Sequence, residues 1–456
     1  MVKYLLLIVF ALAQYTGFSQ KVKVDDLLRI KSTYVKKLDD KVRLSNTLKL
    51  RMDFNSPTII NPGDVNFIKD KSILKVELYY TAFQISENFS QPKLNKERLE
   101  NLQKIFPELF NQSFVTWEFK GQNDCKNEEI AKTYFHGFVI TYKPSGTEAG
   151  AKMEIAGIKT LMKSDSLGYD SVYTVYTTKL KKKKYKTGSY LPTSKRKLEK
   201  GIVYEKKGLF KRKMQYAVRL DTVRYGQQHH KFVKGKNAMS FVKRNLSDST
   251  IFSVLHRHEN WNDIAFVCDV TGSMSAYTTQ LLVWYKLNSV GSKVQYFTFF
   301  NDGDTKSEKS KKIGHIGGIY HVNAENYDAV EMMIEKAMRA GSGGDAPENN
   351  CEALIEAIKE KPNAKEFVMI ADNFANIKDI ELLKSINKPV HIIVCGTGGW
   401  MINTDYLDLA RSTKGSVHSI EQDIDNLMNI NEGQTIDFGG KKYILQDGKF
   451  QPVINL

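Results

Sequence analysis

Four short apolar runs in the second half of the chain constrain its fold more than any other feature of the sequence. They lie at residues 264–268, 294–300, 367–371 and 390–395, and helix-like stretches lie at 276–290, 324–340, 349–359 and 404–412. Continuous apolar strands that alternate with helices are typical of a parallel sheet covered on both faces. The sequence therefore predicts an α/β fold, with a doubly wound, mostly parallel sheet over residues 261–430.

The rest of the chain divides into segments with different patterns. A chain of 456 residues is long enough for two or three domains. Strand-like and helical patterns mix over residues 21–178, which predicts an α+β domain of unidentified type. Residues 179–260 form a basic segment and a bridge, and residues 431–456 are expected to form a C-terminal β-hairpin extension.

The net charge of +16 is unevenly distributed along the chain. Residues 1–260 contain 48 Lys and Arg against 25 Asp and Glu, whereas residues 261–456 contain 19 against 26. Residues 179–213 alone contain 15 basic and two acidic residues. This segment is either a solvated strand edge or loop whose lysines discourage aggregation, or a patch for an anionic surface such as phosphate-bearing glycan or lipid headgroups. Because no base-reading module is recognisable, we do not expect a nucleic-acid partner.

The first twenty residues have the pattern of a secretory signal peptide. Lys3 precedes an apolar run at residues 4–13, and a polar tail with Gly17 and Ser19 follows. The run is too short to cross a bilayer, which takes roughly 20 apolar residues. We therefore expect residues 1–20 to be removed and the mature protein to be periplasmic or extracellular, with no transmembrane segment.

The four cysteines indicate neither a zinc site nor a redox motif. They form no CxxC motif and have no Cys/His ligand spacing, since they lie at Cys125, Cys268, Cys351 and Cys395. Cys268 and Cys395 lie within apolar runs, which indicates small buried hydrophobic residues. An exported protein could still pair two of the four, and the sequence leaves their disulfide state open.

Oxygen-bearing side chains follow the first apolar run directly. Asp269, Thr271 and Ser273 alternate with other residues on a loop that opens a helix. In open parallel sheets, ligands bind beyond the carboxyl ends of the strands, and hard cations such as Mg²⁺ prefer oxygen ligands. The alternative is that Ser273 or Ser275 only caps the helix while Asp269 favours its N-terminus.

Two further acidic segments are expected at the same sheet edge. Asp372 ends the run at 367–371, and the loop Gly-Gly-Asp345-Ala-Pro-Glu348 precedes a helix. Carboxylates delivered by separate strands favour the interpretation of a metal site over that of a helix cap.

Residues 263–430 resemble a von Willebrand factor type A domain. The resemblance rests on Asp269-x-Thr271-x-Ser273, which is similar to the D-x-S/T-x-S motif of the family's metal-ion-dependent adhesion site, on Asp372, and on the closing segment at 407–420. It implies that the motif residues hold a divalent cation, directly or through water, with support from Asp372. It also implies that a partner's acidic side chain completes the coordination. The second loop departs from the family pattern, because Asp345 or Glu348 must take the place of the usual Thr.

Together these features predict an exported, non-enzymatic binding protein that engages a protein partner through a divalent cation. Mg²⁺ is the first candidate, with Ca²⁺ or Mn²⁺ as alternatives. The candidate metal residues are Asp269, Thr271, Ser273, Asp345, Glu348 and Asp372. One competing hypothesis is an envelope scaffold with a vestigial site. A metal-assisted hydrolase is another, for which the sequence offers no evident base and no triad.

Overall fold

The structure is a computed structural model that describes most of the chain. The described residues are 22–38, 45–83, 86, 88–143, 147–163, 168–186, 198–207, 210–236, 240, 248–288, 293–341 and 347–454. The chain divides into two compact units, one comprising Met1–Lys163 with Val242–Leu456 and the other Ser164–Phe241. The expected signal peptide lies outside the described residues.

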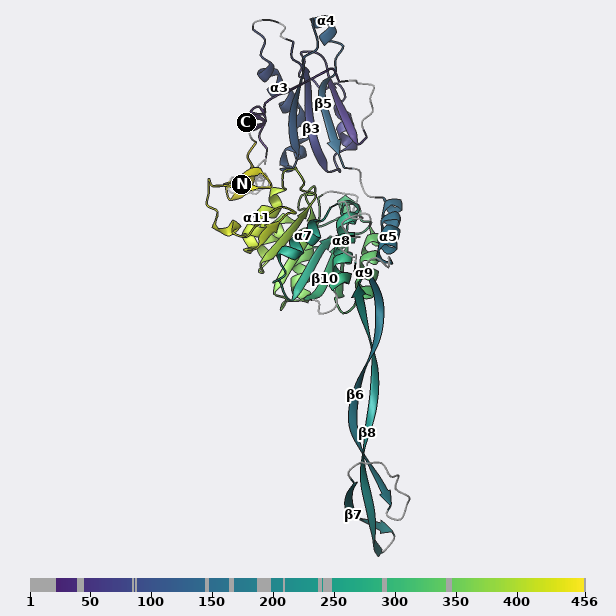
Figure 1. The fold of residues 1–456 in the computed structure, drawn as a ribbon. Coiled ribbons are helices and arrows are strands. Elements are labelled where there is room, and N and C mark those ends of the chain that lie inside the picture. Colours follow the sequence, from purple (N-terminus) through teal and green to yellow (C-terminus); the bar gives the residue numbers. More distant parts are fainter. Residues whose placement is uncertain are drawn as a thin grey trace, which may run out of the picture. The chain divides into compact units, whose positions relative to one another are not determined.

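A mixed five-stranded sheet forms the first part of the larger unit (Figure 1). Its strands are β1 (Thr33–Val35), β2 (Thr47–Met52), β3 (Ile73–Thr81), β4 (Thr116–Gln122) and β5 (His136–Tyr142), in the order β1-β4-β3-β5-β2. The helices of this region are α2 (Val24–Leu27), α3 (Gln91–Ile105) and α4 (Glu128–Ala131), and α5 (Glu148–Met162) follows β5 in the chain. Leu99 and Leu102 of α3 pack with Val76, Leu78 and Phe138 of the sheet into one core. This core combines helices and strands, and the later part of the segment predicted as one α+β domain, from residue 168, belongs to the smaller unit.

A seven-stranded sheet forms the second part of the larger unit. Its strands are β9 (Ile264–Asp269), β10 (Val294–Phe300), β11 (Ile319–Asn323), β12 (Glu366–Asp372), β13 (Val390–Cys395), β14 (Ser416–His418) and β15 (Asp423–Ile424). The order is β11-β10-β9-β12-β13-β14-β15. Neighbours from β10 to β14 are parallel, and the two edge strands are antiparallel. The α/β class is therefore confirmed, and the four predicted apolar runs are β9, β10, β12 and β13.

Helices cover both faces of the seven-stranded sheet, which explains why its central strands are mostly apolar. They are α7 (Thr250–Arg257), α8 (Ser275–Asn288), α9 (Tyr327–Ala340), α10 (Asn350–Glu360) and α11 (Thr404–Thr413). Leu354 of α10 and Tyr406 of α11 share a core with Val267. On the opposite face, Phe266 packs against Trp284 of α8, and α5 lies beside α8 and α9 (Figure 1).

A three-stranded antiparallel sheet ends the larger unit. Its strands are β16 (Thr435–Phe438), β17 (Lys441–Gln446) and β18 (Lys449–Pro452). The expected turn at Asp447-Gly448 joins β17 to β18, and both residues have a positive φ, as a tight hairpin turn requires. A second hairpin through Gly439-Gly440 adds β16. Phe450 and Tyr443 pack into the same core as α11.

The smaller unit is a separate antiparallel sheet in the order β6-β8-β7. Its strands are β6 (Gly168–Lys186), β7 (Leu198–Lys207) and β8 (Phe210–Lys234). At roughly 3.3 Å per residue, the 19 residues of β6 span about 60 Å. The described part of the basic segment at 179–213 therefore lies on strands.

Two further findings bear on the sequence predictions. All four cysteines are free, and Cys268, Cys351 and Cys395 are buried. Within the described ranges, no helix combines the length and apolar character needed to cross a membrane.

Candidate functional site

The candidate site begins where β9 ends. Asp269 is the last residue of β9, and its Oδ1 accepts a hydrogen bond from the Thr271 backbone N–H at 2.8 Å. The Thr271 and Ser273 hydroxyl oxygens lie 3.3 Å apart, on the turn and short 3₁₀ helix (Gly272–Met274) before α8. Asp269 and Thr271 are both only 2 % exposed. One turn thus holds three oxygen donors at the edge of the sheet.

Asp372 comes to the same edge from the neighbouring strand. It is the last residue of β12, which runs parallel to β9 with Ile370 opposite Cys268. Its Oδ1 accepts the Phe374 backbone N–H at 3.1 Å. Burial raises the pKa of Asp269 to about 7, and the Asp372 carboxylate adds to this rise. The two carboxyls that the sequence predicted as partners therefore lie within electrostatic reach of each other.

Glu348 is the third carboxylate of the site. Its backbone is fixed before α10, where its N–H donates to Asn376 O and its carbonyl accepts from Lys378 N. It is 3 % exposed, and its Oε2 has no hydrogen-bond partner. Burial, and after it the charge of Asp269, raises its pKa well above the usual value. Asp345, the alternative for this position, lies outside the described residues.

Lys143 approaches the site from the five-stranded sheet, directly after β5. Its Nζ lies 2.9 Å from Asp372 Oδ2 and 5.3 Å from the ring centroid of Phe374. Sequence reasoning missed this contact, because 229 positions separate the two partners and no motif surrounds the lysine. An ammonium group thus partly offsets the carboxylates.

Asp302 is a further buried carboxylate near the site, and the sequence analysis missed it too. It follows β10, and its Oδ2 lies 2.6 Å from Nζ of both Lys311 and Lys378. Its charge acts on Glu348. Because two lysines already hold its Oδ2, we do not assign Asp302 to the donor set.

The chemistry of the donor set suits a hard divalent cation, although its carboxylates are not gathered tightly. Among the described residues, only His258, His418 and Asp423 bring three ligand atoms within 4.8 Å of one another, and Asp269, Glu348 and Asp372 do not. All the groups are oxygens, as Mg²⁺ and Ca²⁺ prefer, and Glu348 Oε2 is a buried acceptor with no donor. A buried, unpaired carboxylate oxygen is costly, and a cation would remove that cost. The described residues that would hold it are Asp269, Thr271, Ser273, Glu348 and Asp372.

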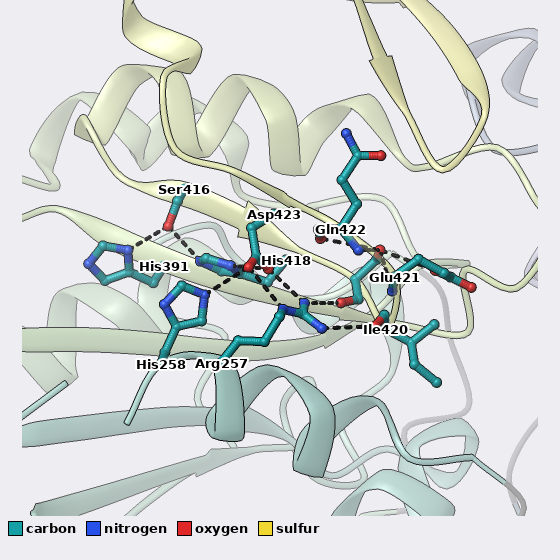
Figure 2. Close-up of polar contacts among 10 residues, drawn as sticks. Arg257, His258, His391, Ser416, His418, Ile420, Glu421, Gln422 and Asp423 are labelled. Carbon is teal, nitrogen blue, oxygen red and sulfur yellow. Dashed lines mark hydrogen bonds and ion pairs between the residues drawn. The ribbon is translucent and has the colours of Figure 1, made fainter. Parts of the chain in front are cut away.

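A second polar cluster lies at the opposite ends of the parallel strands (Figure 2). Asp423, the first residue of β15, accepts both Arg257 Nε at 2.9 Å and Arg257 Nη2 at 2.7 Å. His418 Nδ1 lies 2.8 Å from Asp423 Oδ1, and His258 Nε2 lies 3.2 Å from Asp423 Oδ2. No spacing in the sequence predicts this cluster, because its residues come from α7, β14 and β15.

The cluster continues from His418 along the sheet. His418 Nε2 lies 2.6 Å from Ser416 Oγ, Ser416 Oγ lies 2.6 Å from His391 Nδ1, and His391 Nε2 lies 3.1 Å from Glu366 Oε2. Ser416, His418 and Asp423 thus follow the order of a nucleophile, base and acid. Ser416 is 2 % exposed, so a substrate carbonyl has no approach to its Oγ in this conformation.

Comparison with known proteins adds no relative. No family model, no curated protein and no solved structure matches the chain. The site must therefore be interpreted from its own chemistry.

Proposed function

We propose that residues 261–430 form a binding module of the von Willebrand factor type A kind, which holds a divalent cation and through it engages a protein partner. The cation is Mg²⁺ or, alternatively, Ca²⁺ or Mn²⁺. Asp269, Glu348 and Asp372 supply the charge, and Thr271 and Ser273 contribute neutral oxygens, directly or through water. When bound, the cation supplies an open coordination position for an acidic side chain of the partner.

The observation that carries this proposal is the unpaired Oε2 of Glu348. Both oxygens of the buried Asp379 have donors, the backbone N–H groups of Cys351 and Glu352. Asp302 Oδ2 has two lysines, although Asp302 Oδ1, like Glu348 Oε2, has no hydrogen-bond partner. Glu348 also lies within electrostatic reach of Asp269 and Asp372. This pattern is typical of residues that are arranged for a ligand rather than for stability.

The charge balance at the site favours a cation. Asp269, Glu348 and Asp372 lie near the ammonium group of Lys143, and both Asp302 and Lys378 also act on Glu348. With Lys311 paired to Asp302 as well, four carboxylates meet three ammonium groups, so a deficit of one positive charge remains when all four carboxylates are ionised. A dication offsets this deficit and lowers the repulsion that raises the pKa of Asp269.

The remaining parts of the chain fit an exported role in this proposal. The N-terminal pattern directs the protein to the periplasm or the extracellular space, and the basic strands of the smaller unit offer a contact for an anionic surface. A scaffold in which Lys143 permanently closes the site is the alternative that the Lys143–Asp372 contact favours.

Titration calorimetry on the full chain tests the proposal. We expect Mg²⁺, Ca²⁺ or Mn²⁺ to bind to the wild type, with binding lost in Asp269→Asn. A matched control is Glu356→Gln, which removes an exposed carboxylate of α10 that faces His321, and it should bind as the wild type does. Equal, negligible heats for the wild type and Asp269→Asn would reject the cation and leave the scaffold.

The cation should also raise the unfolding temperature of the wild type, because a ligand that binds only the folded state must stabilise it. Asp269→Asn should show no such rise. A rise of the same size in both proteins would place the ion elsewhere.

A further inference from the structure

The polar cluster of Figure 2 combines two imidazoles and a carboxylate in a small space. One ligand atom each of His258, His418 and Asp423 lies within 4.8 Å of the other two. This cluster uses none of the residues of the proposed cation site, and it lies where the parallel strands begin rather than where they end.

We propose that His258 Nε2, His418 Nδ1 and the Asp423 carboxylate form a second metal site, for a borderline transition-metal ion such as Zn²⁺. Two imidazole nitrogens and one carboxylate are a common three-ligand set for zinc, with a fourth position left to water or a partner group. The site is independent of the function proposed above.

The nitrogen–oxygen distances at the cluster are close to those around such an ion. Ligand atoms about 2.0–2.1 Å from a tetrahedral zinc ion lie roughly 3.3 Å from one another. The two imidazole nitrogens already lie 3.2 and 2.8 Å from the oxygens of Asp423. The two contacts use different oxygens of Asp423, and the three ligand atoms lie within 4.8 Å of one another, so the side chains must draw together around one oxygen to admit the ion.

The surroundings hold the three ligands in place. Arg257 donates hydrogen bonds to both oxygens of Asp423 and to the carbonyls of Ser419 and Ile420. The His258 ring stacks on Trp261 at 4.3 Å, and His418 is fully buried. Outer partners of this kind orient metal ligands and tune their affinity.

Arg257 also decides which metals the site favours. Its positive charge offsets that of Asp423, so the carboxylate attracts a cation less than a free one would. The imidazole nitrogens then supply most of the binding, which favours zinc-like ions over Mg²⁺ and Ca²⁺, since these prefer oxygen ligands.

The directions of the hydrogen bonds are compatible with an ion. Without one, and with His418 neutral, His418 Nδ1–H donates to Asp423, so its Nε2 accepts from Ser416 O–H. Ser416 Oγ then accepts from His391 Nδ1–H. His391 Nε2 is left as an acceptor against Glu366 Oε2, which is itself an acceptor when ionised. One hydrogen bond of this series is therefore mismatched when His418 is neutral, whereas a protonated His418 donates from both ring nitrogens and leaves every contact paired.

An ion on His418 Nδ1 removes this mismatch. His418 Nε2–H then donates to Ser416 Oγ, Ser416 O–H donates to His391 Nδ1, and His391 Nε2–H donates to Glu366 Oε2. Every contact pairs a donor with an acceptor, and the proton on the outer nitrogen of the ligating histidine has the partner that metal sites usually provide.

Zinc binding to the full chain tests this inference, with excess Mg²⁺ present to fill the site at the other end of the strands. The probe is Zn²⁺ in competition with a chromophoric chelator. The variants are His258→Gln, Asp423→Asn and, as a matched control on the same helix, His256→Gln, whose side chain is 83 % exposed. Replacing Zn²⁺ with Co²⁺ adds a visible spectrum that reports tetrahedral nitrogen and oxygen coordination.

We expect one Zn²⁺ per wild-type chain, a tetrahedral Co²⁺ spectrum, and unchanged binding by His256→Gln. Affinity should fall at least tenfold in His258→Gln, which keeps the inference testable if Asp423→Asn fails to fold. Absence of zinc binding by the wild type, or equal affinity in His258→Gln and His256→Gln, would overturn it. Loss of zinc binding in Asp269→Asn but not in His258→Gln would do the same.

Discussion

Glu348 is a buried carboxylate held beside another one, and this arrangement costs stability when no cation is bound. In the presence of a chelator we therefore expect Glu348→Gln to be more stable than the wild type, on the order of 1 kcal/mol, because the neutral amide removes the repulsion with Asp269. Urea unfolding of both proteins, once with EDTA and once with Mg²⁺, measures their stability without and with the cation.

Mg²⁺ should raise the free energy of unfolding of the wild type, and it should raise that of Glu348→Gln only a little. A Glu348→Gln protein that is less stable than the wild type in EDTA, and equally stabilised by Mg²⁺, would show that Glu348 has only a structural role.

His136 predicts a pH dependence of stability in the five-stranded sheet. Its Nε2 lies 3.2 Å from Thr81 Oγ1, and burial, together with the charge of Arg98, lowers its pKa to about 4. The pKa of His136 in the folded protein is below its unfolded value near 6.5. The contribution of neutral His136 to the free energy of unfolding is therefore present above pH 6.5 and is lost as the pH falls toward 4. The loss is on the order of 3 kcal/mol.

The measurement is the free energy of unfolding between pH 4 and 8 for the wild type and for His136→Gln. The difference between them should shrink as the pH falls. A variant of the exposed His315, His315→Gln, should follow the wild type at every pH, and a constant difference for His136→Gln would contradict the prediction.

Part of the candidate site was predictable at the residue scale. Asp269, Thr271 and Ser273 lie within five positions of one another, so their spacing alone indicates oxygen donors on one turn. The contact of Lys143 with Asp372 has no such local signature. The histidine cluster was missed for the same reason, because only the order of β13, β14 and β15 brings its members together.

Gly415 sets the spacing between two strands at the element scale. A Cβ at this position would lie 1.8 Å from the backbone oxygen of Val390, where β13 begins beside β14. We expect Gly415→Ala to destabilise the protein by more than about 2 kcal/mol, since backbone must move. It should also weaken zinc binding, because β14 carries His418.

Gly398→Ala is the matched control, as a Cβ there meets nothing within 4 Å. Thermal unfolding and the zinc competition assay check both variants. Equal stability of the two would mean that β14 can shift away from β13 at little cost.

The end of β5 brings a positive charge to the candidate cation site. We expect Lys143→Met to bind Mg²⁺ roughly fivefold more tightly than the wild type, because an ammonium beside Asp372 competes with the cation for the same carboxylate. Calorimetry with Mg²⁺ measures the change. Unchanged affinity would place the ion away from Asp372. Lys49→Met, at a half-buried position of the edge strand β2, serves as the control for the loss of one lysine.

Strand length explains which elements were predictable. The central strands β9 and β12 each contain five apolar residues in a row, and β10 and β13 are mostly apolar with only Gln295, Thr298 and His391 between. The sequence predicts each of these four strands. β14 and β15 have three and two residues, too few to form a pattern. The order of the strands and the placement of α5 beside α8 and α9 depend on contacts between distant segments, which no local pattern reports.

At the scale of the whole molecule, the smaller unit should be removable. Gly168 and Lys234 are paired neighbours at the open end of β6 and β8, so a short Gly-Ser linker can replace residues 168–234. We expect the shortened protein to keep the unfolding temperature of the larger unit within about 2 °C, because that unit has its own cores. Differential scanning calorimetry checks this, and a large drop in temperature would show that the two units stabilise each other.

The long hairpin has a mechanical consequence. β7 pairs with residues 210–219 of β8, and the remainder of β8 pairs with β6 alone. Tension along the paired strands β6 and β8 would be shared by two covalent backbones, and the backbone hydrogen bonds between them would stay intact. Peeling residues 168 and 234 apart would instead open the pairs one after another. The paired strands therefore suit a tether that is loaded end-on.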